Sequence, residues 1–259
     1  MQVLEECLTM KSLILAAGYA TRLYPLTLNT PKALLNIGGK PMLDYLVEEI
    51  ATLPGMTEAH IVSNHRFITQ FEDWAEGAKD RYPGLKFFVW DDGTTSNDDR
   101  LGAVGDIRFV IEKAGLDDDL LVAASDNFFT FRLIDFAADF HRTGCDTLLC
   151  ARINDLKTLQ SFGVATLGAF NRVLALVEKP KLPPSDVGVY ALYLYRRDTL
   201  PLFQQYLDEG NSKDAPGHFP EWLCTRRDVR AYLFDGECID IGSPEAYEAV
   251  NRRYAGGKT

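Results

Sequence analysis

Residues 15–27, with the sequence LAAGYATRLYPLT, contain the pattern that decides the fold. The apolar run at residues 13–17 predicts a buried β-strand that ends at Gly18. Small residues after a buried strand let backbone N–H groups approach a ligand closely and form an anion-binding loop. Arg22 and, further along the chain, Lys32 would add positive charge where those N–H groups point. The stretch therefore predicts a strand followed by an anion-binding loop.

The segment around this loop carries an unusual local charge. Residues 11–40 contain Lys11, Arg22, Lys32 and Lys40 and no acidic residue, so the segment carries +4. The whole chain carries −10, which leaves −14 on the other residues. An acid-free stretch of this length in so acidic a chain favours a polyanionic ligand. The alternative is a surface loop whose basic side chains only make it soluble.

The overall composition excludes several classes of protein. The chain has 259 residues, of which 46% are hydrophobic, and this is enough for a packed core and argues against a disordered protein. A net charge of −10 argues against general nucleic-acid binding and against anionic membrane surfaces, because both need a basic face. We therefore expect small molecules as partners, with no nucleic acid and no membrane.

Signals for export or membrane insertion are missing from the sequence. The first ten residues lack the basic region of a secretory signal, and no apolar run approaches the roughly 18–20 residues that cross a bilayer. The five cysteines include no CxxC pair, and four scattered histidines offer no zinc-binding pattern. We therefore expect a cytoplasmic protein with reduced, mostly buried cysteines.

The pattern along the chain alternates short apolar runs with amphipathic stretches, which is typical of an α/β fold with right-handed crossovers. In the first half we expect strands at 13–17, 59–63, 85–90 and 120–124, and helices at 41–52, 67–80 and 102–114. In the second half we expect strands at 163–167, 172–178, 187–195 and 229–234, and helices at about 198–208, 216–226 and 243–255. The prediction is a three-layer, Rossmann-like, mostly parallel central sheet with a small substrate-binding extension.

Two familiar nucleotide-binding motifs are absent. There is no GxGxxG fingerprint, and Gly38-Gly39-Lys40 is followed by Pro41 without the earlier glycine of a Walker A loop. The phosphate site must therefore be of another kind.

Residues 15–27, followed by PKALLNIGGKPMLDY at 31–45, closely resemble the opening of the sugar-1-phosphate nucleotidyltransferases of the glucose-1-phosphate thymidylyl- and uridylyltransferase type. The signature of that family is LAxGxGTRLxPLT followed by PK. The resemblance continues through Ser125-Asp126-Asn127, EKP at 178–180, the strand at 187–195 and CIDIG at 238–242. It implies the nucleotide-diphospho-sugar transferase type of fold. We expect a single domain over 1–259, with a nucleotide half at about 10–130, a sugar-phosphate half at about 131–259, and residues 1–9 as an N-terminal extension.

The reaction that the resemblance implies is attack of a sugar-1-phosphate oxygen on the α-phosphate of an NTP, with release of pyrophosphate. Arg22, Lys32 and Asp126 are the implied catalytic residues. Arg22 would hold the triphosphate through its planar guanidinium group, and Lys32 would bridge the reacting phosphates. The implied nucleotide-binding residues are Leu15, Ala16, Ala17, Gly18, Tyr19, Ala20, Thr21, Arg22, Gly93, Asn97 and Gly102.

The resemblance also implies a Mg²⁺ ion bound by Asp126 and Asp240, because two carboxylates with phosphate oxygens and waters suit a hard cation. Asp126 follows an apolar strand, where ligands of open α/β sheets gather. Asp240 lies in the apolar segment CIDIG, where an unpaired charge would be costly. Without the other motifs, Asp126 would be interpreted as a helix cap or a turn residue.

Gly163, Glu178 and Lys179 are the implied sugar-phosphate-binding residues. Glu178 would bind sugar hydroxyls, Lys179 would bind the sugar phosphate, and the backbone of Gly163 would face the sugar. Taken alone, Glu178 and Lys179 would be interpreted as an ion pair at a strand end, and Gly163 as a bulge.

The sequence departs from the family pattern at three places. Ala20 stands where the family usually has glycine, which narrows the freedom of the loop, and Ala191 stands where many relatives have a glycine near the sugar. Residues 90–102, WDDGTTSNDDRLG, replace the usual base-recognition stretch with Gln and Gly. The choice of base therefore stays open.

The predicted function is a Mg²⁺-dependent nucleotidyltransferase that joins an NTP, with dTTP or UTP favoured, to a glucose-1-phosphate-like acceptor. One alternative is a cytidylyltransferase that acts on phosphocholine or another non-sugar phosphate. The others are a glycosyltransferase that uses an NDP-sugar and a non-catalytic regulatory relative that binds nucleotide sugars. The intact loop with Arg22 and Lys32 counts against the glycosyltransferase, and a homo-oligomer stays open.

Overall fold

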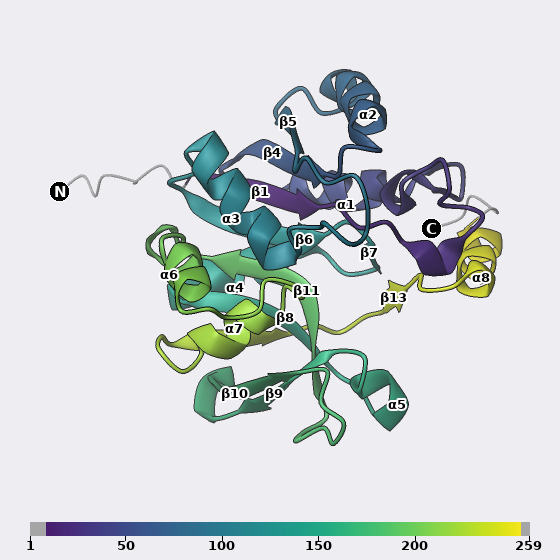
Figure 1. Cartoon of the computed structure of the whole chain (residues 1–259). Helices are drawn as coiled ribbons and strands as arrows, with labels where there is room; N and C mark the ends of the chain where they lie inside the picture. The colour runs from purple at the N-terminus through teal and green to yellow at the C-terminus, as the bar shows by residue number, and fades with distance from the viewer. Residues whose placement is uncertain (1–8, 255–259) are drawn as a thin grey trace.

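The computed structural model describes residues 9–254, with the side chains of Cys238 and Asp240 left aside, so residues 1–8 of the expected extension lie outside it. A nine-stranded sheet runs through the protein and is covered by helices on both faces (Figure 1). Its main strand order is β10-β9-β11-β6-β1-β4-β5, and β8 pairs with β11 and with β12. The predicted three-layer α/β architecture is confirmed.

The elements of the first half agree closely with the expected ones. Its strands in the large sheet are β1 (Met10–Leu15), β4 (Met56–Ser63), β5 (Lys86–Asp91) and β6 (Asp119–Ala124), and its helices are α1 (Met42–Ile50), α2 (Ile68–Arg81) and α3 (Ala103–Ala114). These strands pair in parallel. The central strands β1 and β6 are mostly buried, as expected when helices cover both faces, whereas the edge strand β5 has no fully buried residue. Pro41 precedes α1 and lies in the short strand β3 (Lys40–Pro41), which pairs with β2 (Asn36–Ile37).

The second half contains elements that the sequence-based prediction lacks. The expected strands are present as β9 (Gly163–Leu167), β10 (Val173–Glu178), β11 (Val187–Tyr195) and β12 (Val229–Leu233), and the expected helices as α6 (Leu202–Asp208), α7 (His218–Leu223) and α8 (Pro244–Tyr254). No element was expected at 128–162, where the structure has α4 (Leu133–Thr143), β8 (Asp146–Arg152) and α5 (Leu156–Leu159). The short strands β7 (Asn127–Phe129) and β13 (Cys238–Asp240) pair with each other away from the large sheet.

The two helical layers bury separate apolar cores. Buried side chains of α1, α2 and α4 form one core with one face of the sheet, and those of α3, α6 and α7 form the other. β11 runs antiparallel to β6 and joins the two halves into one sheet. Within the described residues, no helix is long and apolar enough to span a membrane.

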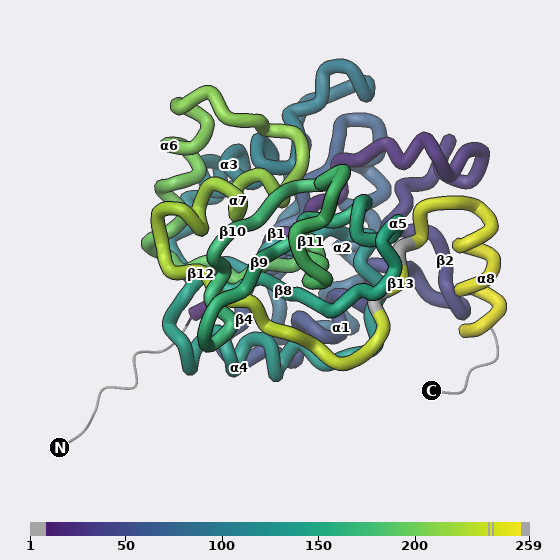
Figure 2. The backbone as a smooth tube through the Cα atoms, turned by 90° about the horizontal axis from the view of Figure 1, so that it is seen from below, coloured from purple at the N-terminus to yellow at the C-terminus, as the bar shows by residue number. Residues whose placement is uncertain are grey.

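The neighbouring carboxyl ends of β1 and β6 position the site. The two strands are parallel and in register, so Leu15 lies opposite Ala124, and the chain leaves the sheet beside Ser125 and Asp126. Ligands of open α/β sheets bind at this edge. Figure 2 shows α8 and β13 on the same flank of the protein, where α8 packs against β2.

Candidate active site

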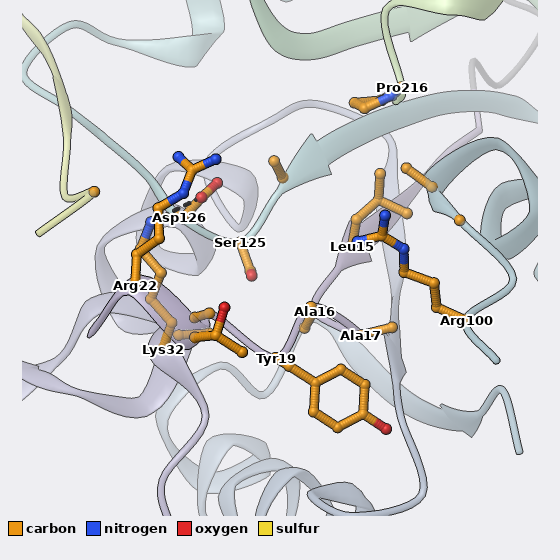
Figure 3. A pocket seen from close by; sticks show the side chains of 18 of the residues that line it. Leu15, Ala16, Ala17, Tyr19, Arg22, Lys32, Arg100, Ser125, Asp126 and Pro216 are labelled. Atoms are coloured by element: carbon orange, nitrogen blue, oxygen red, sulfur yellow. Dashed lines mark hydrogen bonds and ion pairs between the residues drawn. The ribbon is translucent and has the colours of Figure 1, made fainter. Parts of the chain in front are cut away.

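A pocket with a volume of about 760 Å³ opens at the carboxyl ends of β1 and β6 (Figure 3). The loop after β1 forms one wall, and eight consecutive residues of it line the pocket: Leu15, Ala16, Ala17, Gly18, Tyr19, Ala20, Thr21 and Arg22. Asn64 holds this loop by donating from Nδ2 to the carbonyl oxygen of Ala17 at 2.9 Å. The residues that the sequence predicts to contact one ligand therefore face a single cavity.

Ala20 adopts a backbone conformation that favours glycine. Its φ of 46° and ψ of 44° lie in the left-handed region, directly before a short 3₁₀ turn at Thr21–Leu23. An L-residue in this region costs about 1–2 kcal/mol. The hydroxyl of Thr27 donates to the carbonyl oxygen of Ala20 at 2.8 Å and so holds the strained turn in place. The position where the family usually has glycine therefore has a positive φ in this chain, and Ala20 adopts it at an energetic cost that glycine would not have.

Lys32 and Asp126 form an ion pair in this pocket. Lys32 Nζ lies 2.8 Å from Asp126 Oδ2, and the side chains are 13% and 42% exposed. Lys32 is held in a 3₁₀ turn after Pro31, and Asp126 follows β6, so the pair joins segments that are 94 residues apart. Figure 3 shows the side chain of Arg22 on the same side of the pocket as this pair. Positive and negative charge are thus concentrated at one end of the cavity.

The positive charge of residues 11–40 is divided between two places. Arg22 and Lys32 line the pocket, as the acid-free segment predicts. Lys11 instead forms ion pairs with Glu58 and Asp118, and Lys40 pairs with Glu48. Lys11 and Lys40 therefore do not belong to the site, and the local charge that faces the cavity is half of what the sequence indicates.

Asn97, Arg100, Gly102, Asp106 and Asp214 also line this pocket, and Figure 3 shows Arg100 across it from Arg22 and Lys32. Gly102 precedes α3 with a φ of +80°, and a Cβ atom there would overlap the carbonyl oxygen of Lys213. The first two N–H groups of α3 donate to Asp214 and Lys213 at 2.8 and 3.0 Å. The start of α3 is therefore capped by carbonyl oxygens of a segment from the second half of the chain.

Gly93 is the one predicted nucleotide-binding residue that does not line this pocket. Its N–H group donates to Asp91 Oδ1 at 2.8 Å within the turn that follows β5. Asn97 and Gly102, by contrast, both line the pocket as expected. The φ of +76° at Gly93 serves the turn itself.

Asp106 is a residue of this pocket that sequence reasoning missed. It lies in the first turn of α3 and is only 6% exposed, among the buried apolar residues Val104, Ile107 and Val110. Burial, with a smaller contribution from Asp92, raises the pKa of Asp106 to about 8. The available signal was an acidic residue on the apolar face of a predicted helix.

A second pocket of about 290 Å³ adjoins the first and shares with it Ala124, Asp126, Ser161, Lys179 and Pro216. Gly163 and Glu178 line this second pocket. Glu178 fits closely between two glycines, because a Cβ on Gly163 would lie 3.0 Å from Oε2 and one on Gly217 would lie 2.8 Å from Cδ. Burial raises the pKa of Glu178, although the positive charge of Lys179 opposes this.

Ala191 also lines the second pocket. Its carbonyl oxygen accepts a hydrogen bond of 2.8 Å from Asn127 Nδ2, which fixes β11 against the segment that follows Asp126. The departure from glycine at this position therefore places a methyl group at the wall of the smaller cavity.

The chemistry of the donor groups fits a hard divalent cation. The carboxylate of Asp126 lines both pockets, and β13 pairs with β7 so that the backbone of Asp240 lies opposite Asn127, the residue after Asp126. The side chain of Asp240, and with it the predicted metal pair, lies outside what the structure describes. Among the described residues, no three His, Cys, Asp or Glu side chains form a metal-binding group. In the predicted site, oxygen atoms of a bound ligand would complete the coordination that Asp126 and Asp240 begin.

Comparison with known proteins gives consistent results. A family model described as nucleotidyl transferase matches residues 11–256. A putative mannose-1-phosphate guanyltransferase from Sulfolobus acidocaldarius is 28% identical over 93% of the chain, which spans 62% of that protein's length. The UTP–glucose-1-phosphate uridylyltransferase AglF from Haloferax volcanii is 24% identical, over 94% of the chain and 96% of its own length.

A solved structure of a UDP-glucose pyrophosphorylase in complex with UDP-glucose superimposes with a TM-score of 0.79. The two sequences are 21% identical, and the match covers 96% of the chain and all of that structure. This likeness shows a shared fold. At such identity it does not by itself assign a substrate.

Proposed function

The chain belongs to the nucleotidyl transferase family, and we propose that it transfers a nucleotidyl group from an NTP to a sugar-1-phosphate, giving an NDP-sugar and pyrophosphate. The observation that supports this most strongly is the meeting of two pockets at Asp126 and Lys179. A large cavity beside an anion-binding loop suits a triphosphate, and a small one beside a buried carboxylate suits a sugar. The two pockets meet at charged residues. This arrangement suits transfer of the nucleotidyl group from the NTP in the large pocket to the sugar phosphate in the small one.

The triphosphate would lie along the loop after β1. We name this wall, residues 15–33 together with Asp126, the phosphate side. Arg22 and Lys32 would neutralise charge on the phosphates, and the backbone around Gly18 would donate hydrogen bonds. Positioning and charge neutralisation are the main needs of an in-line phosphoryl transfer, because the protein forms no covalent bond in it.

The base would then lie against the opposite wall. We name Asn97, Arg100, Gly102, Asp106 and Asp214 the base side. Support comes from its separation from Arg22 and Lys32: Figure 3 shows Arg100, which belongs to the base side, across the pocket from both residues. Among the NTPs we favour dTTP or UTP, with a glucose-1-phosphate-like acceptor.

The acceptor would occupy the smaller pocket. Glu178 would accept hydrogen bonds from sugar hydroxyls, Lys179 would bind the phosphate, and Gly163 would leave room for the ring. Support comes from the close fit of Glu178 between Gly163 and Gly217, which fixes its carboxylate at the wall. We also propose that the chain acts as one domain with a nucleotide half and an acceptor half, because both halves contribute to each pocket.

A magnesium ion fits this arrangement, with Asp126 and Asp240 as the residues that would hold it. When bound, such an ion polarises phosphate oxygens and neutralises the charge that develops on them. Lys32, paired with Asp126 at 2.8 Å, keeps that carboxylate oriented toward the pocket.

A panel of four NTPs against glucose-1-phosphate, other sugar-1-phosphates and phosphocholine tests the proposal, with pyrophosphate release in Mg²⁺ as the measurement. We expect release with UTP or dTTP and a hexose-1-phosphate. Turnover only with CTP and phosphocholine would instead support the cytidylyltransferase. Binding of NDP-sugars without any turnover would support a regulatory relative, and transfer of sugar from an NDP-sugar would support a glycosyltransferase.

A further inference from the structure

The Asp106 carboxyl group is buried in the wall of the nucleotide pocket without a complete set of partners. The side chain is 6% exposed, and Oδ1 is sealed from solvent with no hydrogen-bond partner among the described residues. A buried polar oxygen without a partner costs about 1–3 kcal/mol, so native proteins rarely keep one without a reason. Asp106 nevertheless lines the larger of the two adjoining pockets.

The charged groups around Asp106 favour its neutral form. β1, β4 and α6 pack against α3, and the groups that act on Asp106 electrostatically are Asp92, after β5, and Lys213, before α7. Asp92 Oδ1 accepts hydrogen bonds from the N–H and the hydroxyl of Thr94 at 2.8 and 2.7 Å. Asp92 Oδ2 and Asp106 Oδ1 are both buried without a partner among the described residues, and no hydrogen bond from Thr94 or another described residue reaches Asp106 Oδ1. Of two neighbouring carboxyls, the one with donors ionises first and the other keeps its proton.

The position of Asp106 separates it from the phosphates. Neither Arg22 nor Lys32 is among the groups that act on its charge. It lies in the wall with Asn97 and Arg100, where the proposed function puts the base. A bound base would supply the hydrogen-bond partner that Asp106 lacks, since χ2 of an aspartate is a soft torsion that turns either oxygen toward the pocket.

Building on the proposed function, we propose that Asp106 binds the nucleotide base as a neutral carboxylic acid and pairs with the imide edge of uracil or thymine rather than with the edge of guanine. A neutral carboxyl group has one O–H donor and one carbonyl acceptor. The N3–H of uracil and thymine, next to a carbonyl oxygen, offers the matching acceptor and donor. An ionised carboxylate has only acceptors, and it matches instead the two adjacent N–H groups of guanine.

The test is the dissociation constant of UTP, measured by calorimetry at pH 7 and pH 9. Because burial raises the pKa of Asp106 to about 8, the wild-type protein loses the neutral form between these values. We expect binding to weaken about tenfold from pH 7 to pH 9. Asp106→Asn keeps one donor and one acceptor at every pH, so it should bind with similar affinity at both values.

Two controls accompany this experiment. Asp98→Asn changes an exposed acid in the loop before α3 and should retain the wild-type pH dependence. N3-methyl-UTP lacks the imide N–H and needs no protein variant: it should bind the wild type about tenfold or more weakly than UTP does at pH 7. Ionisation of the triphosphate itself affects all variants equally.

The possible results separate the two proposals. If UTP binds and pyrophosphate is released, but wild type and Asp106→Asn share one pH dependence or N3-methyl-UTP binds as UTP does, the role of Asp106 is wrong. If GTP binds more tightly than UTP and its affinity rises with pH, a carboxylate that binds guanine replaces the neutral acid. If no NTP binds at either pH, the proposed function itself fails.

Discussion

The phosphate side of the large pocket comes almost entirely from one continuous segment, residues 15–33, with Asp126 as its single distant member. The base side joins residues 97–106 to Asp214, and backbone hydrogen bonds from the first turn of α3 to Lys213 and Asp214 hold the two segments together. On the phosphate side, Lys32 and Asp126 already form an ion pair at 2.8 Å. On the base side, Asp106 Oδ1 lacks a partner among the described residues.

This difference separates two tasks. Backbone N–H groups and basic side chains suit any triphosphate, because the phosphates of all four NTPs are alike. Discrimination needs a buried polar group that only the right base satisfies, since a wrong base leaves it unpaired. The phosphate side therefore suits the reaction that the family shares, and the base side suits the choice of substrate.

The largest expected effect is the loss of activity in Asp126→Asn, which tests the phosphate side. The substitution removes the charge that pairs with Lys32 and that would hold Mg²⁺. We expect kcat for pyrophosphate release to fall about 10²–10³-fold. Because the side chain is 42% exposed, the free energy of unfolding should change by less than about 1 kcal/mol.

Asp73→Asn, an exposed acid on α2, is the matched control and should leave kcat unchanged. Full activity of Asp126→Asn across a Mg²⁺ titration would contradict the metal assignment. Unfolding of the variant, detected by circular dichroism, would show that Asp126 has a structural role instead.

Gly102→Ala tests how the base side is assembled. A Cβ there would overlap the carbonyl oxygen of Lys213 and lie 2.9 Å from the Cα of Asp214, at a φ of +80°. We expect the free energy of unfolding to fall by about 3 kcal/mol and KM for the NTP to rise. Gly93→Ala has a similar φ of +76° with nothing within 4 Å, so it should lose only the backbone cost of about 1–2 kcal/mol. Equal losses in chemical denaturation would show that the contact with residues 213–214 contributes nothing.

Glu178→Gln extends the comparison to the smaller pocket. A neutral amide binds hydroxyls less strongly than a carboxylate, so KM for the sugar-1-phosphate should rise about 10–100-fold.

The same variant also tests the effect of Glu178 on stability. Burial raises the pKa of Glu178, so the wild type loses stability as the pH rises from the unfolded-state pKa through the folded-state pKa. The variant lacks this loss, and its melting temperature should exceed that of the wild type at neutral pH but not at pH below both pKa values. The exposed Glu76→Gln should show neither effect, and a variant less stable than wild type at neutral pH would contradict the sign.

The same contrast explains how far the sequence allowed prediction. The loop at 15–22 and its strand follow from local features, namely an apolar run, small residues and a nearby arginine, and they form one wall of a pocket. The approach of Asp126 to Lys32 was expected only through the resemblance to a family, because the two residues are 94 positions apart. Asn97 and Gly102 were named without a mechanism and Asp106 was not named, since the geometry of this wall depends on contacts of α3 with the distant residues 213–214.

Two misses have clear physical causes. The strand β8 is buried through Leu148, Leu149 and Cys150, and the helix α4 through Leu133, Phe136 and Phe140. The available signal was Gly144, which ends α4 in the left-handed conformation as Gly115 ends α3, and the prediction did not use it. The charge of residues 11–40 was counted as one unit, although ion pairs to acids outside the segment withdraw Lys11 and Lys40 from the site. Net charge in a segment does not specify the direction in which its side chains point.

Ala20→Gly has the smallest expected effect and tests whether the phosphate side is strained by its own sequence. The left-handed conformation of Ala20 costs about 1–2 kcal/mol, and glycine removes this cost but adds about 0.4–1 kcal/mol of entropy in the unfolded chain. We expect a net stabilisation of roughly 0.5–1 kcal/mol, measured as a rise of about 1–4 °C in melting temperature.

The control is Ala51→Gly, at an exposed position with a φ of −65°. This variant should instead destabilise the protein by about 0.5–1 kcal/mol. If both variants were destabilised alike, the hydrogen bond from Thr27 and the packing of the loop would already compensate the strain. A stabilised variant with an unchanged KM for UTP would show that the strain at Ala20 is not needed to bind the triphosphate.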